Sequence, residues 1–347
     1  SDVYKRQDLD IESVFRSRLR DPRPRKENPT ILNEIGTSQL IHVSDTVSRR
    51  RDPIPIEPPA APMGEVEEVY RALVLGTHDY LAKTGFSKAI IGLSGGVDSA
   101  LTAAVAVDAL GHKNVVGVAM PSRFSSEGSI SDAKELADNL GIELWTVPIE
   151  LAHKAFADML EPHFRDTVPN VAEENVQSRI RGNVLMTISN KFGWIVLTTG
   201  NKSEMAMGYA TIYGDMAGGF SVLKDVPKTL VYRLCEWRNK HGGPSNAIPG
   251  TVISKPPSAE LKENQVDQDS LPPYDVLDPV VKAYVEMDSS YEEMVAMGLD
   301  PQIVNQVIRF TDRSEYKRRQ AAPGVKITPR AFGKDRRLPI VNRYRQG

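Results

Sequence analysis

The chain has 347 residues, 40% of them hydrophobic and 25% charged, with a formal net charge of −2. That length can bury a full hydrophobic core, while the near-neutral charge offers no broad basic field for nucleic acid or anionic lipid. No segment reaches the ~18 consecutive apolar residues of a membrane helix, and the charged opening residues lack the apolar core of a secretory signal. The single cysteine, Cys235, cannot form an internal disulfide, so we expect a cytoplasmic protein. From the charge and the lack of a long apolar segment, we expect no nucleic-acid or membrane partner.

Residues 1–62 differ in composition from the rest of the chain. The stretches RDPRPRKENP and RRRDPIPIEPPAAP are basic and rich in proline, and neither has apolar periodicity. Such sequences are typical of extended linkers. We therefore predict a tail or linker over 1–62 and a globular domain over 63–347.

From residue 63 onward, apolar periodicity predicts alternating helices and strands. Helices are predicted over residues 64–85, 97–110, 129–141 and 172–190, and strands over 88–93, 114–120, 142–149 and 194–200. Strands that alternate with helices indicate an α/β fold, a doubly wound parallel sheet with helices on both faces. We found no internal repeat.

Loops and further helices follow residue 200. The loop-rich stretches cover 213–220, 241–250 and 254–275, with a helix around Cys235. Two helices are predicted within 276–309, and the chain then ends in a basic segment.

The hexapeptide SGGVDS, residues 94–99, lies between the first strand and the next helix. Gly95 and Gly96 allow backbone N–H groups to approach an anion, and the helix N-terminus adds positive potential. The P-loop lysine and the G-x-G-x-x-G fingerprint are both absent. A carboxylate beside phosphate requires a cation between them, so we assign Asp98 to Mg²⁺ and Ser94 and Ser99 to phosphate oxygens. The alternative is an ordinary glycine-rich turn with Asp98 as a helix-start residue.

This hexapeptide resembles the pyrophosphate loop of the N-type ATP pyrophosphatases, which split ATP between its α- and β-phosphates. Further stretches resemble the NAD synthetase family, in family order over about residues 64–340: MPSRFSSEGSISDAKELADNLGI, ENVQSRIRGN, TTGNKSEMAMGYATIYGDMAGGFSVLKDVPKTLVYRL, SKPPSAELKENQVDQDSLPPYDVLD and EYKRRQAAPGVKITPRAFGKDRR. The match is to the synthetase half of the two-domain, glutamine-dependent enzymes. It implies the adenine nucleotide alpha hydrolase-like fold.

The resemblance implies ATP-dependent amidation of deamido-NAD to NAD⁺ through an NAD-adenylate, with release of AMP and pyrophosphate. Mg²⁺ would be the metal, ammonia the nitrogen donor here, and glutamine the donor in the full-length form. It also implies a homodimer, and it makes residues 1–62 the remnant of an upstream glutaminase domain.

The resemblance carries over site residues one by one. Those implied for ATP and pyrophosphate are Ser94, Gly95, Gly96, Val97, Ser99, Arg123, Thr199 and Ser258. Those implied for deamido-NAD are Asn175, Arg179, Arg181, Lys202, Lys224, Asp225 and Lys317. Asp98, Asp215 and Lys228 would be catalytic, and Asp98 and Glu204 would bind the metal.

Several alternatives stay open at this point. Glu204 could be a solvated helix-start carboxylate, Asp215 a turn residue and Lys202 a surface lysine. The basic cluster of Lys317, Arg318, Arg319 and Lys326 could be a solvated face. The chain could also be another AMP-forming ligase of the GMP synthetase or tRNA-modifying type, or a nucleotide-binding module without catalysis.

Overall fold

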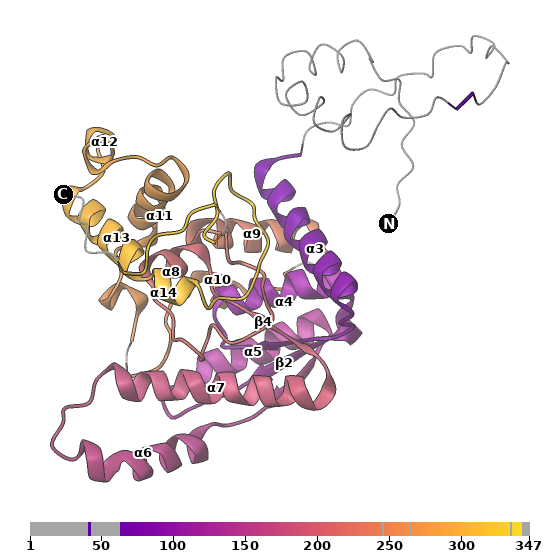
Figure 1. The fold of residues 1–347 in the computed structure, drawn as a ribbon. Coiled ribbons are helices and arrows are strands. Elements are labelled where there is room, and N and C mark those ends of the chain that lie inside the picture. Colours follow the sequence, from indigo (N-terminus) through magenta and orange to yellow (C-terminus); the bar gives the residue numbers. More distant parts are fainter. Residues whose placement is uncertain (1–40, 43–62, 245, 264, 334, 342–347) are drawn as a thin grey trace. The chain divides into compact units, whose positions relative to one another are not determined.

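The structure is a computed structural model that describes residues 41–42, 63–244, 246–263, 265–333 and 335–341. The chain divides into two units, residues 1–62 and 63–347, and nearly all of the described residues belong to the second unit. The prediction of a tail over residues 1–62 falls almost entirely outside the described residues. Element labels are those of Figure 1.

A parallel sheet forms the centre of the fold, and within the described residues it has five strands in the order β3-β2-β1-β4-β5. Their bounds are Ala89–Gly92 (β1), Val115–Ala119 (β2), Glu143–Thr146 (β3), Ile195–Thr198 (β4) and Phe220–Ser221 (β5). In the register, Ile91 of β1 lies between Gly117 of β2 and Leu197 of β4. All neighbouring strands run parallel, which confirms the predicted α/β class.

Helices pack on both faces of this sheet. The α-helices are Glu65–Thr84 (α3), Val97–Leu110 (α4), Glu127–Leu140 (α5), Glu150–Phe164 (α6), Val171–Phe192 (α7), Lys202–Met207 (α8), Lys228–His241 (α9), Gly250–Ser254 (α10), Tyr274–Val281 (α11), Tyr291–Ala296 (α12), Pro301–Arg313 (α13) and Glu315–Arg318 (α14). Short turns of other helix types cover His112–Asn114, Asp267–Asp269 and Lys282–Glu286. Among the helices in the described ranges, none combines the length and apolar character needed to cross a membrane.

Both faces of the sheet are buried because successive strand residues point to opposite sides. Ile91 and Leu197 pack with α3, α4, α5 and α9 in one hydrophobic cluster. Ile90 and Val196 pack on the other side with Ile180 of α7. Figure 1 shows α7 along this second face, and α6 packs against α7. The predicted arrangement of helices on both faces is thereby confirmed.

The structure differs from the sequence-based prediction at three places. Strand β3 is four residues long, where eight were expected, because this edge strand ends before Pro148. Helix α6 was not predicted, since its apolar residues do not form one buried stripe. The two helices expected within 276–309 are instead α11, α12 and α13, because the side chains of Ser290 and Asp300 cap new helix starts.

Candidate functional site

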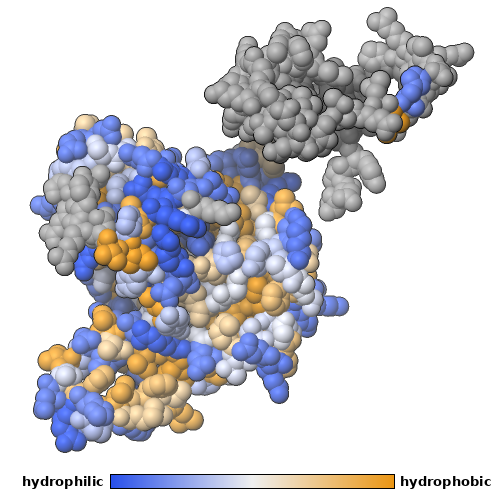
Figure 2. All heavy atoms as spheres, in the orientation of Figure 1, coloured by the Kyte–Doolittle hydropathy of each residue, from blue (hydrophilic) through white to orange (hydrophobic). Residues whose placement is uncertain are grey.

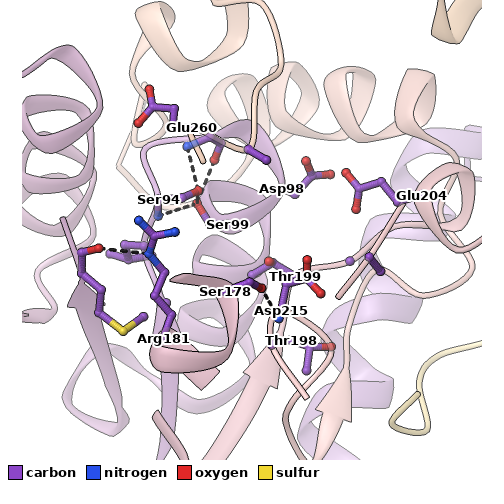
Figure 3. Close-up of a pocket in the computed structure, with 18 of the residues that line it drawn as sticks. Ser94, Asp98, Ser99, Ser178, Arg181, Thr198, Thr199, Glu204, Asp215 and Glu260 are labelled. Atoms are coloured by element: carbon purple, nitrogen blue, oxygen red, sulfur yellow. Dashed lines mark hydrogen bonds between the residues drawn. The ribbon is translucent and has the colours of Figure 1, made fainter. Parts of the chain in front are cut away.

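A cavity of about 280 Å³ opens at the carboxyl ends of β1, β2 and β4. The chain order of the strands reverses between β1 and β4, and ligands of open α/β sheets bind at such switch points. The predicted site residues that line the cavity are Ser94, Gly96, Val97, Asp98, Ser99, Arg181, Thr199, Glu204, Asp215, Lys228 and Ser258. Figure 3 shows how several of these side chains converge.

The loop after β1 wraps closely around the start of α4. Gly95 has φ +76°, and a Cβ there would lie 2.3 Å from the Ser129 carbonyl oxygen, so only glycine fits. The Ser94 and Ser99 hydroxyls lie 3.2 Å apart. Among the described residues, no side chain caps the N-terminus of α4, which begins at Val97. Its free N–H groups therefore face the cavity, as an anion site requires.

Two carboxylates face each other across the cavity, with a lysine between them. Asp98 projects from the first turn of α4 and Glu204 from α8, and Figure 3 shows the two groups pointing toward one another. The Lys228 ammonium forms an ion pair with Asp98 and lies 3.5 Å from Glu204 Oε1. Asn201 Nδ2 donates a hydrogen bond of 2.9 Å to Asp98 Oδ1.

This arrangement shifts the ionisation of its members. Burial, followed by repulsion from Asp98, raises the pKa of Glu204 to about 8. Burial disfavours the Lys228 ammonium, but the neighbouring Asp98 and Glu204 carboxylates outweigh that effect and raise the pKa of Lys228. Ionisation of both carboxylates therefore requires a cation beside them, and among the residues that the structure describes Lys228 contacts both.

The donor set suits a hard divalent cation. In the described part of the chain, no group of three or more His, Cys, Asp or Glu residues is placed to hold a metal ion. Mg²⁺ in phosphate-transfer sites commonly takes one or two carboxylates and completes its shell with phosphate oxygens and water. Asp98 and Glu204, facing each other beside an anion-binding loop, fit that pattern.

Asp215 also lines the cavity, where Figure 3 shows it beside Ser178. Its backbone N–H donates to Ser178 Oγ at 3.0 Å, and its Oδ1 accepts from the Thr211 N–H at 2.8 Å. The side chain is open to the cavity, but the surrounding protein removes bulk water from the carboxylate and raises its pKa to about 6. An acid with that pKa exchanges a proton readily near neutral pH.

Arg181 and Ser258 line the cavity from α7 and from the segment before α11. Arg181 Nε donates to the Met120 carbonyl oxygen at 3.1 Å, and burial lowers the pKa of its guanidinium. The Ser258 hydroxyl donates to the Gln265 carbonyl and accepts from the Glu260 N–H at 3.1 Å. A second guanidinium nitrogen donates to the Ser122 hydroxyl at 3.4 Å, so the backbone and one side chain orient Arg181 toward the cavity.

The other predicted site residues do not line the cavity in the described structure: Gly95, Arg123, Asn175, Arg179, Lys202, Lys224, Asp225 and Lys317. Arg123 is exposed and pairs with Glu150. Arg179 Nε donates to the Ile212 carbonyl at 3.3 Å, and Lys224 Nζ to the Ala322 carbonyl at 2.6 Å.

Three of these residues instead hold neighbouring loops. Asn175 Oδ1 accepts from the Thr211 hydroxyl at 2.6 Å, and Lys317 Nζ donates to the carbonyls of Gly208 and Ala210, each at 2.7 Å. Both contacts fix the loop that carries Asp215. Lys202 pairs with Asp225 away from the cavity, at 2.9 Å.

The basic cluster near the C-terminus does not form one solvated face. Arg318 is 5% exposed and pairs with Glu315, whereas Lys326 pairs with Asp335 at the surface. The alternative of a single solvated face is therefore wrong.

The structure adds lining residues that the sequence did not single out. Glu260 accepts hydrogen bonds from Ser126 at 2.9 Å and Ser129 at 2.6 Å, at the N-terminus of α5. Asp267 lines the cavity and accepts a 2.8 Å hydrogen bond from the Tyr274 hydroxyl. Both acids belong to the stretch SKPPSAELKENQVDQDSLPPYDVLD, which has no periodicity, so the signal that could have found them was its resemblance to the family.

The fold and the site together define an α/β nucleotide-phosphate-binding protein of the adenine nucleotide alpha hydrolase-like class. Comparison with protein-family models places residues 69–321 in the family described as NAD synthase, and this chain belongs to that family.

Two curated relatives are glutamine-dependent NAD(+) synthetases. The protein from Thermotoga maritima is 48% identical over 341 residues, covering 98% of this chain and 58% of that protein. The protein from Synechocystis sp. is 54% identical over 283 residues, covering 82% of this chain and 50% of that protein. The chain thus spans between half and three fifths of the length of these relatives.

A solved structure shares the fold. The glutamine-dependent NAD⁺ synthetase from Acinetobacter baumannii, in complex with ADP, matches with a TM-score of 0.57 and 45% identity over 83% of this chain and 52% of that one.

Proposed function

We propose that this chain catalyses the ATP-dependent amidation of deamido-NAD to NAD⁺, with AMP and pyrophosphate as the other products. One observation carries the proposal: Asp98, Glu204 and Lys228 converge beside the glycine loop, at the end of β1. The NAD synthase family and the two curated relatives support the choice of substrates.

In the first half-reaction, a carboxylate oxygen of deamido-NAD attacks the α-phosphorus of ATP. The bond from that phosphorus to the pyrophosphate oxygen breaks, which leaves NAD-adenylate and pyrophosphate. The N–H groups at the start of α4 and the Ser94 and Ser99 hydroxyls bind the departing pyrophosphate. Lys228 neutralises the negative charge that accumulates on it.

Magnesium is the metal that fits this site. When bound by Asp98 and Glu204, Mg²⁺ would screen the phosphate charges and favour departure of the pyrophosphate. With the nucleotide bound, the Lys228 ammonium would supply positive charge to the phosphate oxygens beside these carboxylates.

In the second half-reaction, ammonia attacks the carbonyl carbon of the adenylate. The bond between that carbon and the AMP oxygen breaks, AMP leaves, and the nitrogen loses a proton. Asp215 is the proposed acceptor of that proton, because the pKa of its carboxyl is about 6.

Free ammonia, and not glutamine, is the nitrogen donor proposed for this chain. The sole cysteine of the chain, Cys235, is fully buried, and burial raises the pKa of its thiol, so it cannot attack glutamine. We propose that glutamine serves as donor only where a glutaminase domain is joined to this one, as the names of the relatives suggest.

The chain is further proposed to act as a homodimer. Helix α6 carries large apolar residues that are exposed, among them Leu151 at 86% and Met159 at 62%. Figure 2 shows apolar side chains gathered over this helix. A second copy that covers this surface would remove it from water.

The test is formation of NAD⁺ from deamido-NAD, ATP and MgCl₂, with ammonium chloride or glutamine supplied in parallel. We expect NAD⁺ with ammonium and much less with glutamine. AMP formation that depends on XMP or tRNA in place of deamido-NAD would indicate a different ligase of the superfamily. ATP binding without release of pyrophosphate under any of these conditions would indicate a nucleotide-binding module.

A further inference from the structure

A second charged cluster lies outside the cavity. Lys202, the first residue of α8, is 1% exposed. Its ammonium lies 2.9 Å from Asp225 Oδ1, 2.7 Å from Glu286 Oε1 and 2.8 Å from Thr328 Oγ1. Four segments that are far apart in sequence thus meet at one buried lysine. Buried ion pairs contribute little net stability compared with apolar packing, so their clearest effect is to fix geometry.

Asp225 joins the C-terminal segment to this cluster. Its Oδ2 accepts hydrogen bonds from the backbone N–H groups of Ile327 at 2.9 Å and Thr328 at 2.8 Å. The Thr328 hydroxyl donates to the same oxygen at 2.7 Å. Because this hydroxyl also accepts from Lys202, it links the two partners of the ion pair.

Two residues of the cluster are close in sequence to two residues of the site. Lys202 stands two residues before Glu204, and Asp225 stands three residues before Lys228. The Lys202 N–H donates to the Val226 carbonyl at 2.9 Å, which holds the start of α8 against the segment that enters α9. The Lys228 N–H likewise donates to the hydroxyl of Ser203 at 2.9 Å, inside the first turn of α8. The first turns of α8 and α9 therefore form one clamped unit.

We propose that Lys202, Asp225 and Thr328 are positioning residues for the proposed reaction, on which this inference rests. By clamping the starts of α8 and α9, they set the separation of Glu204, the proposed metal ligand, and Lys228, the proposed partner of the pyrophosphate. The C-terminal segment at residues 327–328 is part of that clamp. Lys202 and Asp225 do not line the cavity, which favours this role over the expected contact with deamido-NAD.

The test uses a matched pair at one position. Thr328→Val removes the hydroxyl and keeps the shape, whereas Thr328→Ser keeps the hydroxyl and loses the methyl group. Lys326→Met is the control, since Lys326 lies in the same segment but pairs with Asp335 at the surface. The readouts are kcat, KM for each substrate, the calorimetric Kd of ATP with Mg²⁺, and thermal unfolding.

We expect Thr328→Val to lower kcat about tenfold or more and to weaken ATP binding, because small displacements in a site are costly to rate. KM for deamido-NAD should stay near that of the parent protein. Thr328→Ser and Lys326→Met should stay within about twofold of the parent in every readout.

Equal kcat and equal ATP affinity for the valine and serine variants would overturn the inference. So would a valine variant that melts earlier but keeps both values at temperatures where it is folded. If Thr328→Val does not fold, Glu286→Gln takes its place, since it weakens the contact to Lys202 without altering shape. If the parent protein binds ATP but forms no NAD⁺, the proposed function fails, and the ATP affinities still decide whether the clamp acts.

Discussion

At the scale of single residues, the site holds more negative than positive charge around the start of α4. Asp98 and Glu204 share the contact of one ammonium, that of Lys228. Burial, followed by repulsion from Asp98, raises the pKa of Glu204 to about 8, because the one lysine does not offset both effects. Such a site gains stability when a divalent cation binds with the phosphates of a nucleotide.

The first prediction concerns Asp98. Asp98→Asn should reduce pyrophosphate release by about 10²- to 10³-fold, because an amide binds Mg²⁺ less well and no longer pairs with Lys228. Enzyme-coupled detection of pyrophosphate measures the loss, and circular dichroism should show an unchanged fold. Asp79→Asn, an exposed change on α3, is the control and should be fully active. Normal release by Asp98→Asn would refute the assignment of Asp98.

The second prediction is a pH dependence set by Asp215. Its pKa is raised to about 6 because the surrounding protein desolvates it, so the carboxylate form is lost as pH falls below that value. If this carboxylate takes the proton from nitrogen, kcat should fall about tenfold per pH unit below pH ~6.

The measurement is a kcat profile in which free ammonia is held constant, since ammonium itself releases more ammonia as pH rises. Asp215→Asn should be slow and should lack this acidic limb. If Asp215→Asn keeps the acidic limb of the kcat profile, the limb belongs to a titrating group other than Asp215.

At the scale of secondary structure, the start of α8 combines a helix cap with a site contact. Asn201 Oδ1 accepts from the Glu204 N–H at 3.0 Å, while its Nδ2 donates to Asp98. The carboxylate of Glu204 in turn accepts a hydrogen bond of 3.3 Å from the Asn201 N–H, which completes a capping box. The side chain of Asn201 therefore both caps α8 and orients Asp98 in the site.

The third prediction separates these two roles. Asn201→Ser keeps an oxygen that can cap the helix but loses the amide donor to Asp98, and Asn201→Ala loses both. We expect both variants to lose activity, and only the alanine variant to lose about 1 kcal/mol in the free energy of unfolding. Denaturant titration and the NAD⁺ assay measure the two effects. A fully active serine variant would show that the contact to Asp98 is dispensable.

The same scale explains what the sequence could and could not predict. The helix over 97–110 was predicted with its observed bounds, since its apolar run ends at Gly111. The central strands were each predicted within two residues of their ends, because buried parallel strands are short apolar runs. Helix α6 was missed because none of its residues, all of which are described, is fully buried.

The strand-to-helix junction at SGGVDS brings Ser94, Asp98 and Ser99 to the cavity, while their roles in binding stay predictions. Helix geometry explains why two of the predicted residues, Lys202 and Arg179, do not reach the cavity. Lys202 and Glu204 stand two positions apart on α8, and so do Arg179 and Arg181 on α7. Two positions correspond to about 200° around a helix, so only one residue of each pair can face the cavity. Sequence alone does not say which one.

At the scale of the whole molecule, the exposed surface of α6 predicts self-association. Leu151→Glu combined with Met159→Glu should convert the proposed dimer to a monomer, because charge on the apolar surface opposes burial. Sedimentation velocity measures the change, and thermal unfolding should show that the monomer stays folded. Leu75→Glu on α3, where Leu75 is 62% exposed, is the control and should leave the oligomer unchanged. A parent protein that sediments as a monomer would contradict the proposed dimer.

In the proposed reaction, this cavity joins the carboxylate of deamido-NAD to AMP before nitrogen enters. The most direct measurement is one round of reaction with deamido-NAD labelled with ¹⁸O in its carboxylate, followed by mass spectrometry of the products. We expect one ¹⁸O in AMP and one retained in the amide of NAD⁺. Label in pyrophosphate or inorganic phosphate, or AMP that carries no label, would contradict it.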